Sequence, residues 1–219
     1  MRIRDVYNQF IYRVDRLATN ASQHIAHPQF VAIINKAQLH WAELRMKSME
    51  VNKTRVDELQ QLLNDYELVG TASGNFSRVK LPPDYFHLSR TYSEVKECRG
   101  VVYGRLVEEG NINVLLQDSF TKPSAAWEET LVTIFKGHLR VYVDGFTVGK
   151  TYVKYYRLPK PVNIAGYVDA YGVQSSDVDL EFDGVNAQEI IDMAAQIALG
   201  DVGDMDRLAT ISQHIQSHN

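Results

Sequence analysis

The chain has 219 residues, 45% of them hydrophobic and 23% charged, with a formal net charge of -4 at pH 7. Such a chain can bury a core as one domain or two small ones, and its acidic balance argues against non-specific nucleic-acid binding. A single cysteine, Cys98, excludes an internal disulfide and a multi-cysteine metal site. The charged, amphipathic N-terminus is unlike a secretory signal, and no apolar run reaches the roughly 18–20 residues that span a bilayer. We therefore expect a soluble protein that folds in a reducing cytoplasm.

The first third of the sequence predicts helices. Apolar residues recur every three or four positions over residues 3–17, the spacing of one helix face. A second helix is expected from Pro28, which suits a first turn, to about Glu50. Its apolar stripe would consist of Phe30, Ile34, Ala37, Trp41 and Leu44. A shorter helix should follow, with Thr54 as its N-cap and Asp57 at the capping-box position.

The middle of the chain predicts strands. From about Val79 to Gly166, five segments are rich in β-branched and aromatic residues: VKECRGVVYGRLV, INVLLQD, ETLVTIF, HLRVYVD and TYVKYYRL. In HLRVYVD, alternation should place Leu139, Val141 and Val143 on one face and Arg140 and Tyr142 on the other. Short strands separated by turns predict a small antiparallel β sandwich or barrel.

The last part predicts an acidic loop and two helices. After the loop SSDVDLEFDG, Asn186 should cap a helix, with Glu189 as its capping-box partner and Gly200 at its end. The buried face of this helix would consist of Ile190, Ile191, Ala194, Ile197 and Ala198. The final helix carries Leu208, Ile211 and Ile215.

The order of helices, strands and helices predicts the α+β class. We expect residues 1–70 and 184–219 to form a helical bundle, with the β domain, 71–183, inserted between them.

The stretch DGFTVGKT ends like a phosphate-binding loop. A P-loop needs four residues between its glycines and a helix after them, but Gly145 and Gly149 are three residues apart and an extended segment follows. We therefore expect no nucleotide site. Asp144-Gly145 should form a type I′ hairpin turn, and Gly149 a bulge.

The acidic loop partly matches a calcium loop. Asp179, Glu181 and Asp183 occupy positions one, three and five, but position twelve is Ile190 instead of the required Glu. A structural loop is the first interpretation, and a weak calcium site is the alternative.

No catalytic or metal-binding constellation emerges. His214 and His218 share a helical spacing without a third ligand, and His24 and His27 flank a proline. Cys98 should behave as a small buried residue. A Cys98–His nucleophile pair stays open, although no nucleophile elbow supports it. We expect no catalytic residue, cofactor or metal.

Tyrosines are abundant near the end of the β region, at Tyr152, Tyr155 and Tyr156. Tyr152 and Tyr156 should share one face of a strand. Such rings could stack bases, but without basic residues around them we expect packing or a protein interface.

Several motifs resemble a known family. Leu81-Pro82-Pro83-Asp84-Tyr85 is similar to the leucine-proline-x-aspartate-aromatic motif before the inserted β domain of head-to-tail adaptor and tail-tubular ring proteins of short-tailed bacteriophages. The later part resembles neck and ring proteins of crAss-like phages, with motifs matched by Tyr155, Tyr156, Arg157 and Pro159 and by Glu189, Ile190 and Ile191.

The resemblance implies a virion structural protein without enzymatic activity, assembled in the host cytoplasm. It would form a ring of about twelve subunits, bind the portal and neighbouring neck or tail rings, and let genomic DNA pass without sequence-specific binding. The residues expected at its interfaces are Tyr152, Tyr156, Asp177, Asp179, Phe182, Leu208, Ile211 and Ile215. The last helix has an alternative role, packing against the N-terminal helices.

Two other functions remain open. One is a soluble, non-catalytic protein-binding module, which would bind one or two partners without closing a ring. The other is an enzyme with a site around Cys98 and a histidine, which would need a reactive thiolate.

Overall fold

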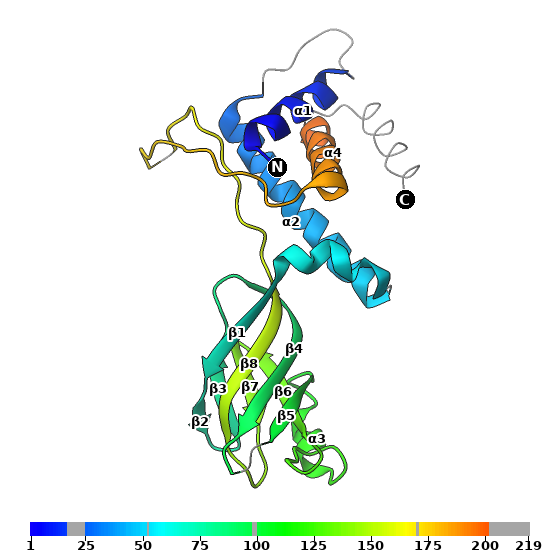
Figure 1. Ribbon diagram of the computed structural model, residues 1–219, viewed down its shortest axis with the longest axis vertical. Coiled ribbons are helices and arrows are strands. Elements are labelled where there is room, and N and C mark those ends of the chain that lie inside the picture. Colours follow the sequence, from blue (N-terminus) through cyan, green and yellow to red (C-terminus); the bar gives the residue numbers. More distant parts are fainter. Residues whose placement is uncertain (17–24, 52, 98–99, 170, 202–219) are drawn as a thin grey trace. The chain divides into compact units, whose positions relative to one another are not determined.

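The computed structural model describes residues 1–16, 25–51, 53–97, 100–169 and 171–201 (Figure 1). The chain divides into two compact units, Met1–Gln61 with Pro159–Asn219 and Leu62–Leu158, which we call the helical unit and the β unit. The β domain was expected to span residues 71–183, whereas the β unit spans residues 62–158. A strand already begins at Leu63, and the segment after Pro159 is bonded to the helices.

The helical unit contains helices α1 (Ile3–Arg16), α2 (His27–Val51) and α4 (Gly184–Asp201) and the 3-10 helix η1 (Lys53–Leu62). Helix α4 packs against both α1 and α2. None of the helices among the described residues combines the length and apolar character needed to cross a bilayer.

The predicted apolar stripes of α1, α2 and α4 form the core of this unit. The buried side chains include Ile3, Val6, Phe10, Val14, Phe30, Ile34, Ala37, Trp41, Ile190, Ile191, Ala194 and Ala198. Leu44 was expected in the stripe of α2 but is 42% exposed, because the buried face continues through Trp41, Ala42 and Met46 and leaves Leu44 on the other side. Ile197 is only half-buried.

Three details predicted for α4 are wrong. The helix begins at Gly184, so Asn186 lies inside its first turn, and it continues through Gly200 to Asp201. Glu189 accepts hydrogen bonds from the Trp41 indole N–H, at 2.7 Å, and from Arg45, so its carboxylate ties α4 to α2 rather than closing a capping box.

The β unit contains one eight-stranded sheet, in the order β1-β8-β4-β5-β6-β7-β3-β2. The strands are β1 (Leu63–Val69), β2 (Thr71–Ser73), β3 (Phe76–Lys80), β4 (Tyr85–Val95), β5 (Val101–Leu106), β6 (Glu129–Phe135), β7 (His138–Tyr142) and β8 (Val148–Arg157). The fold is therefore α+β, as predicted. The sheet is a curled half-barrel and is mixed rather than antiparallel, because β5 and β6 run parallel.

The parallel pair explains another wrong prediction. A parallel connection must cross over the sheet, and the segment INVLLQD, expected to be a strand, forms helix α3 (Ile112–Gln117) in that crossover. Ile112, Leu115 and Leu116 have the spacing of a helix face, and they pack with Leu131 and Tyr142 on the outer face of the sheet.

The two faces of the sheet are buried by different parts of the β unit. The inner face of the curl holds the larger core cluster, which includes Val79, Val102, Leu139, Val141, Val153 and Tyr155. The predicted alternation in β7 is confirmed, since Leu139 and Val141 lie in this cluster and Tyr142 lies in the one beneath α3. Helix α3 covers the outer face only over the half made by β6, β7 and β3.

One bent segment forms both edges of the sheet. Strand β1 pairs with β8 and, after Gly70, the chain continues as β2, which pairs with β3. A Cβ on Gly70 would lie 2.1 Å from the Ser77 hydroxyl oxygen and 3.1 Å from a Val79 methyl carbon, so this close approach favours glycine. The chain thereby leads from one edge of the curl to the other.

The GKT sequence lies in β8. Asp144-Gly145 joins β7 to β8, which are not neighbours in the sheet, so the predicted hairpin there is wrong. The tight turn is instead Lys136-Gly137, with φ of 47° and 72°, between the paired strands β6 and β7. A register shift between β4 and β8 falls beside Gly149, where a bulge was predicted.

We expect residues 62–158 to fold when expressed alone. The unit contains its own two apolar clusters, and its cut ends lie on the paired strands β1 and β8. Circular dichroism and urea unfolding of this fragment should show one cooperative transition. A fragment without cooperative unfolding would contradict the independence of the β unit.

Leu139→Ala should destabilise that fragment by about 2–5 kcal/mol, because a fully buried leucine would leave a cavity in the inner core. Phe120→Ala is the matched control: its ring is 95% exposed, and the change should stay within about 0.5 kcal/mol. The urea midpoints of the two variants report the change in the free energy of unfolding. An equal decrease in both would mean that Leu139 does not anchor the core.

Candidate interaction surfaces

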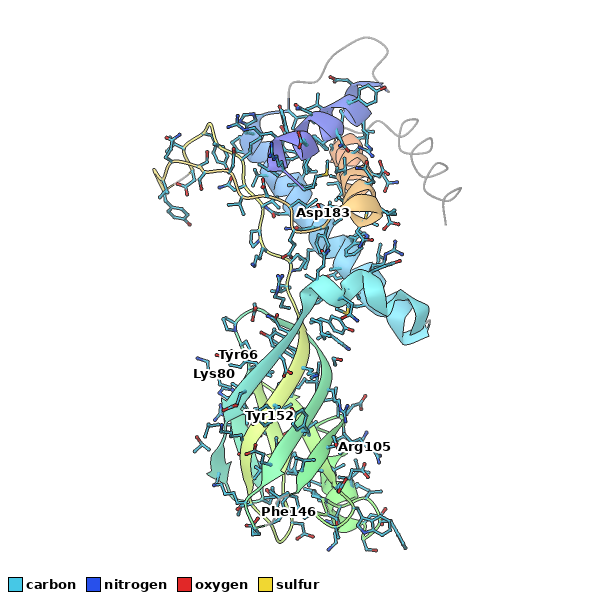
Figure 2. The ribbon with its side chains drawn as sticks, viewed as in Figure 1. Tyr66, Lys80, Arg105, Phe146, Tyr152 and Asp183 are labelled. Atoms are coloured by element: carbon cyan, nitrogen blue, oxygen red, sulfur yellow. The ribbon has the colours of Figure 1, made fainter. Side chains whose placement is uncertain are left out.

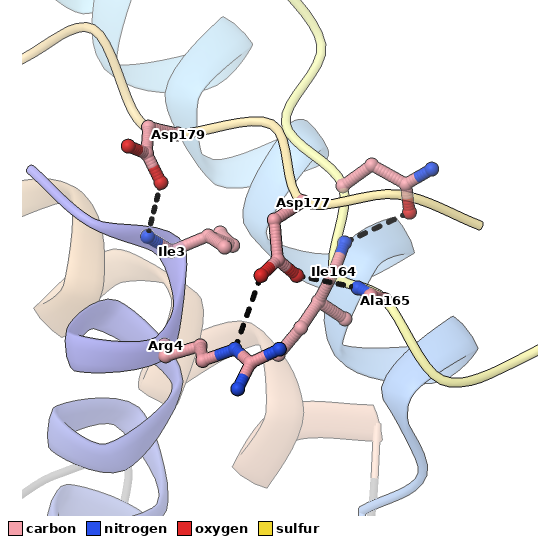
Figure 3. Close-up of polar contacts among 7 residues, drawn as sticks. Ile3, Arg4, Ile164, Ala165, Asp177 and Asp179 are labelled. Carbon is pink, nitrogen blue, oxygen red and sulfur yellow. Dashed lines mark hydrogen bonds and ion pairs between the residues drawn. The ribbon is translucent and has the colours of Figure 1, made fainter.

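The acidic segment 177–183 binds the start of the chain. Asp179 accepts a hydrogen bond from the Ile3 N–H at 2.8 Å, and Asp177 binds the Arg4 guanidinium at 3.0 Å (Figure 3). Asp183 pairs with the terminal ammonium at 2.8 Å. A carboxylate at a helix N-terminus satisfies free N–H groups and opposes the helix dipole. The acidic residues therefore hold α1, each facing a different partner.

This arrangement leaves no calcium loop among residues 177–183. Glu181 accepts a hydrogen bond from the Lys160 N–H, away from the other carboxylates. Among the residues that the structure describes, no group of three or more His, Cys, Asp or Glu side chains could hold a metal ion.

Residues 163–178, described except for Ala170, form an ordered excursion that we call the finger. In Figure 1 this yellow segment extends away from α1, α2 and α4. Backbone bridges join Asn163 to Val178 and Val168 to Gln174. The Asp169 carboxylate accepts hydrogen bonds from the N–H groups of Tyr171 and Val173, both at 2.9 Å. The finger thus has an internal hydrogen-bond framework.

The tip of the finger is apolar and exposed. Tyr171 is 93% exposed, Val173 60% and Val168 57%. An ordered loop that presents apolar side chains to solvent is typical of a protein-binding element.

A row of three tyrosines crosses the uncovered half of the outer sheet face. Tyr103, Tyr92 and Tyr152 are register partners on β5, β4 and β8. The Tyr92 and Tyr152 rings stack at 4.8 Å between centroids, and Tyr92 meets Tyr103 at 6.4 Å. The Tyr152 hydroxyl donates to Glu94 at 3.0 Å, and this hydrogen bond, followed by burial, raises the pKa of Tyr152. The packing predicted for Tyr152 is present.

Basic residues lie beside this row, which the sequence analysis did not anticipate. Arg90 and Lys154 are direct register partners on β4 and β8, and Arg105 follows Tyr103 by two positions on β5 (Tyr152 and Arg105 are labelled in Figure 2). The Arg90 guanidinium lies 4.7 Å from the centre of the Tyr103 ring. We call Tyr92, Tyr103, Tyr152, Arg90, Arg105 and Lys154 the tyrosine face.

A third exposed set lies in the β5–β6 crossover. Phe120 is 95% exposed, Trp127 84% and Val114 71%. The loop is nevertheless ordered: Asp118 accepts a hydrogen bond from the Phe120 N–H at 3.0 Å, and the Tyr103 N–H donates to the Glu128 carbonyl at 2.8 Å. We call Phe120, Trp127 and Val114 the crossover patch.

The other predicted interface residues are not on the surface or lie outside the described residues. Phe182 is fully buried against Trp41, at 4.9 Å between ring centres, and Tyr156 is 3% exposed. These two side chains cannot contact a partner in this conformation. Leu208, Ile211 and Ile215 lie outside the described residues, as do Cys98, His24, His214 and His218.

The pocket beside the crossover loop offers no reactive group. It has a volume of about 260 Å³ and is lined in part by Asn75, Gln117 and Ser119. Its charged residues, Lys122 and Asp144, are paired with each other at 2.9 Å. No nucleophile–base pair lines this pocket.

The most exposed aromatic residues were missed at the sequence level. Tyr171, Phe120 and Trp127 are single aromatic residues in polar loops, and such isolation is itself a signal of exposure. The tyrosine face had no such signal, because its three tyrosines come from strands that meet only in the folded sheet.

Asp177→Asn should change how stability depends on pH. The Ala165 N–H, and then Arg4, lower the pKa of Asp177 below its usual value near 3.8. A lowered folded-state pKa contributes stability above the usual value, and this is lost as the pH falls through the folded-state value. The variant should therefore have a lower Tm than the wild type at about pH 6, and this difference should shrink as the pH falls below the usual value of the carboxyl group.

Thermal unfolding followed at 222 nm measures this difference. Glu43→Gln removes an exposed carboxylate from α2 as a control and should show no comparable change. A Tm difference that stays constant from neutral to strongly acidic pH would contradict the role of Asp177.

Comparisons with known proteins give no family for this chain: no protein-family model matches it, and no curated protein is significantly similar to it. The surfaces described above therefore carry the functional proposal.

Proposed function

We propose that this protein is a non-catalytic structural subunit of a bacteriophage virion that assembles into a ring at the head-to-tail connector or tail. The observation that carries the proposal is the nearly complete exposure of Tyr171, Phe120 and Trp127 on loops held by internal hydrogen bonds. Exposed aromatic side chains on ordered loops are expected where a partner covers them.

The distribution of these surfaces supports an assembly subunit. The finger belongs to the helical unit, and the crossover patch and tyrosine face belong to the β unit. A ring subunit contacts a neighbour on each side through two different surfaces, so it needs more than one such surface. In this proposal α1, α2 and α4 form the helical bundle of a connector subunit, and the ring encloses a DNA conduit without reading the DNA sequence.

The pocket beside the crossover loop supports a structural role more than an enzymatic one. The pocket beside the crossover loop holds only a paired lysine and aspartate as charged groups. The second candidate is a protein-binding module, which the exposed finger alone would serve.

The test is the mass of the full-length protein by light scattering at rising concentration, with negative-stain images of the same fractions. We expect closed rings of about a dozen subunits with a central hole. A complex limited to one or two copies would indicate the binding module. A monomer that also fails to bind the portal of its phage would contradict the connector role.

A further inference from the structure

We propose that the outer face of β3 and β7 contacts the phosphate backbone of duplex DNA without reading its sequence. The inference deepens the proposed function by naming the surface of the subunit that meets the DNA, and it rests on that function for the choice of DNA over RNA. The surface consists of Arg78, Lys80, Lys136, His138 and Arg140, and we call it the basic face.

The basic face begins where the cover of helix α3 ends. Helix α3 packs over Tyr142, the last residue of β7. Along the same two strands, Arg78 lies opposite Arg140, and Lys80 lies opposite His138. Because successive side chains alternate between the two faces of a strand, these four share the outer face with Tyr142. Arg78 and Lys80 are exposed, and the Arg78 guanidinium lies 3.2 Å from the ring nitrogen Nδ1 of His138.

The cations of this face outnumber its acids. Strands β2, β3 and β7 and the turns before β3 and β7 contain four Lys or Arg residues and no Asp or Glu. Glu109 is hydrogen-bonded to Arg140 and neutralises its charge. Within the described part of the chain, Arg78, Lys80 and Lys136 form no ion pair with a carboxylate. Three positive charges are therefore left uncompensated.

The tyrosine face differs from the basic face in this respect. There, Lys154 lies 3.7 Å from Asp65, and Arg105 lies 3.6 Å from Glu129. The cations of the tyrosine face thus have carboxylate neighbours, so this second surface of the same sheet provides an internal comparison.

The acidic net charge of the whole chain does not exclude an anionic partner at this face. Salt screens exposed charges over about 8–10 Å, so the nearby side chains determine the potential at a surface. Arg78 and Arg140 are direct register partners, and like charges in this position destabilise paired strands. A phosphate above the two side chains would offset their repulsion.

The aromatic rings of this face favour a duplex over a single strand. Proteins that hold single strands stack the bases on aromatic side chains. Here the Phe135 ring centre lies 4.2 Å from the Arg140 guanidinium and 5.3 Å from the Lys136 ammonium, and Arg140 also lies 5.1 Å from the Phe76 ring centre. The rings already have cations beside them and offer no free platform for a base. A duplex needs none, because it presents its phosphates outward.

The surroundings of the basic face suit phosphates better than a protein partner. Thr71 and Ser73 on β2 are exposed register partners of Arg78 and Phe76, so they add hydroxyl donors beside the guanidinium. Arg, Lys, Ser and Thr side chains supply many of the contacts to phosphate in protein–DNA complexes. The cores of protein interfaces are instead apolar and depleted in Lys. No large apolar side chain is exposed on β2, β3 or β7, whose residues are all described.

Three uncompensated cations predict a weak contact for each subunit. Every phosphate that is neutralised releases counterions, so the logarithm of the affinity falls with the logarithm of the salt concentration, with a slope of about -0.9 per contact. Three contacts would therefore lose about 40-fold in affinity between 50 and 200 mM salt. Contacts of this kind let a protein slide along DNA, which a conduit for the genome requires.

The experiment uses the full-length chain and fluorescent DNA duplexes of two unrelated sequences. The basic-face variant is Arg78→Gln with Lys80→Gln. The matched control is Arg105→Gln with Lys154→Gln, which removes the same charge from the tyrosine face. Fluorescence anisotropy between about 50 and 200 mM salt measures the affinity of each protein, with all proteins compared in the same assembly state.

We expect the wild type to bind both sequences equally and to lose about 40-fold in affinity over this salt range. The basic-face variant should bind about tenfold more weakly or less at the lowest salt, and should lose only about 3- to 4-fold over the range, because one contact remains. The control should behave as the wild type.

Stability is checked by circular dichroism and Tm. Because Arg78 faces Arg140, the basic-face variant should keep the Tm of the wild type or exceed it. If its Tm falls, Lys136→Gln replaces it as the test, since this exposed side chain follows the end of β6. Lys136→Gln should reduce the salt slope by about one.

The other outcomes separate this inference from the proposed function. Rings that do not bind the duplex would overturn the basic face and leave the ring function standing, as would a control that weakens binding as much as the basic-face variant. Tighter binding of a thymidine single strand, or of polyglutamate as a model for an acidic protein, would also overturn it. Duplex binding with the expected salt dependence by a protein that neither forms rings nor binds the portal would support the basic face and contradict the ring function.

Discussion

The pairing of β1 with β8 is the constraint on which both units depend. These strands carry the chain into and out of the β unit, and they pair in register from Leu63–Tyr156 to Val69–Lys150. Because the two strands are neighbours, the long insertion starts and finishes at one place. The helical segments on either side of it can therefore pack as one unit, in which α4 contacts α1 and α2 although more than a hundred residues separate them in sequence.

Local patterns predicted much of the helical unit, because three- and four-residue periodicity is a property of the segment itself. The stripe from Phe30 to Trp41 is an example. The sheet was less predictable, since strand partners depend on distant residues. A short segment with four apolar residues, such as that of α3, fits either a strand or a helix by periodicity alone, and only the parallel β5–β6 pair requires a crossover there. The acidic segment was correctly predicted as a loop, but its partners, Ile3 and Arg4, lie more than 170 residues away in sequence.

The candidate surfaces also depend on residues that are distant in sequence, so local patterns could not predict them. Tyr152 was expected to pack, and it does, yet two of the three basic residues beside it, Arg90 and Arg105, come from other strands, β4 and β5. The sequence also did not reveal which aromatic residues of the loop segments are buried. Phe182 packs against Trp41, whereas Tyr171 faces solvent. The exposed aromatic residues on ordered loops are therefore the main argument for a function in assembly. The resemblance to phage proteins suggests the kind of assembly that we propose.

The bend at Gly70 has a consequence for how the free chain behaves at high concentration. Exposed strand edges let identical chains add to one another and grow into fibres. Here one bent segment occupies both edges, β2 is only three residues long, and Asp65 and Glu67 place charges on β1. These features disfavour edge-to-edge aggregation. In the assembly that we propose, many copies of the chain would be made at once, and these features would let them accumulate without being lost to insoluble material.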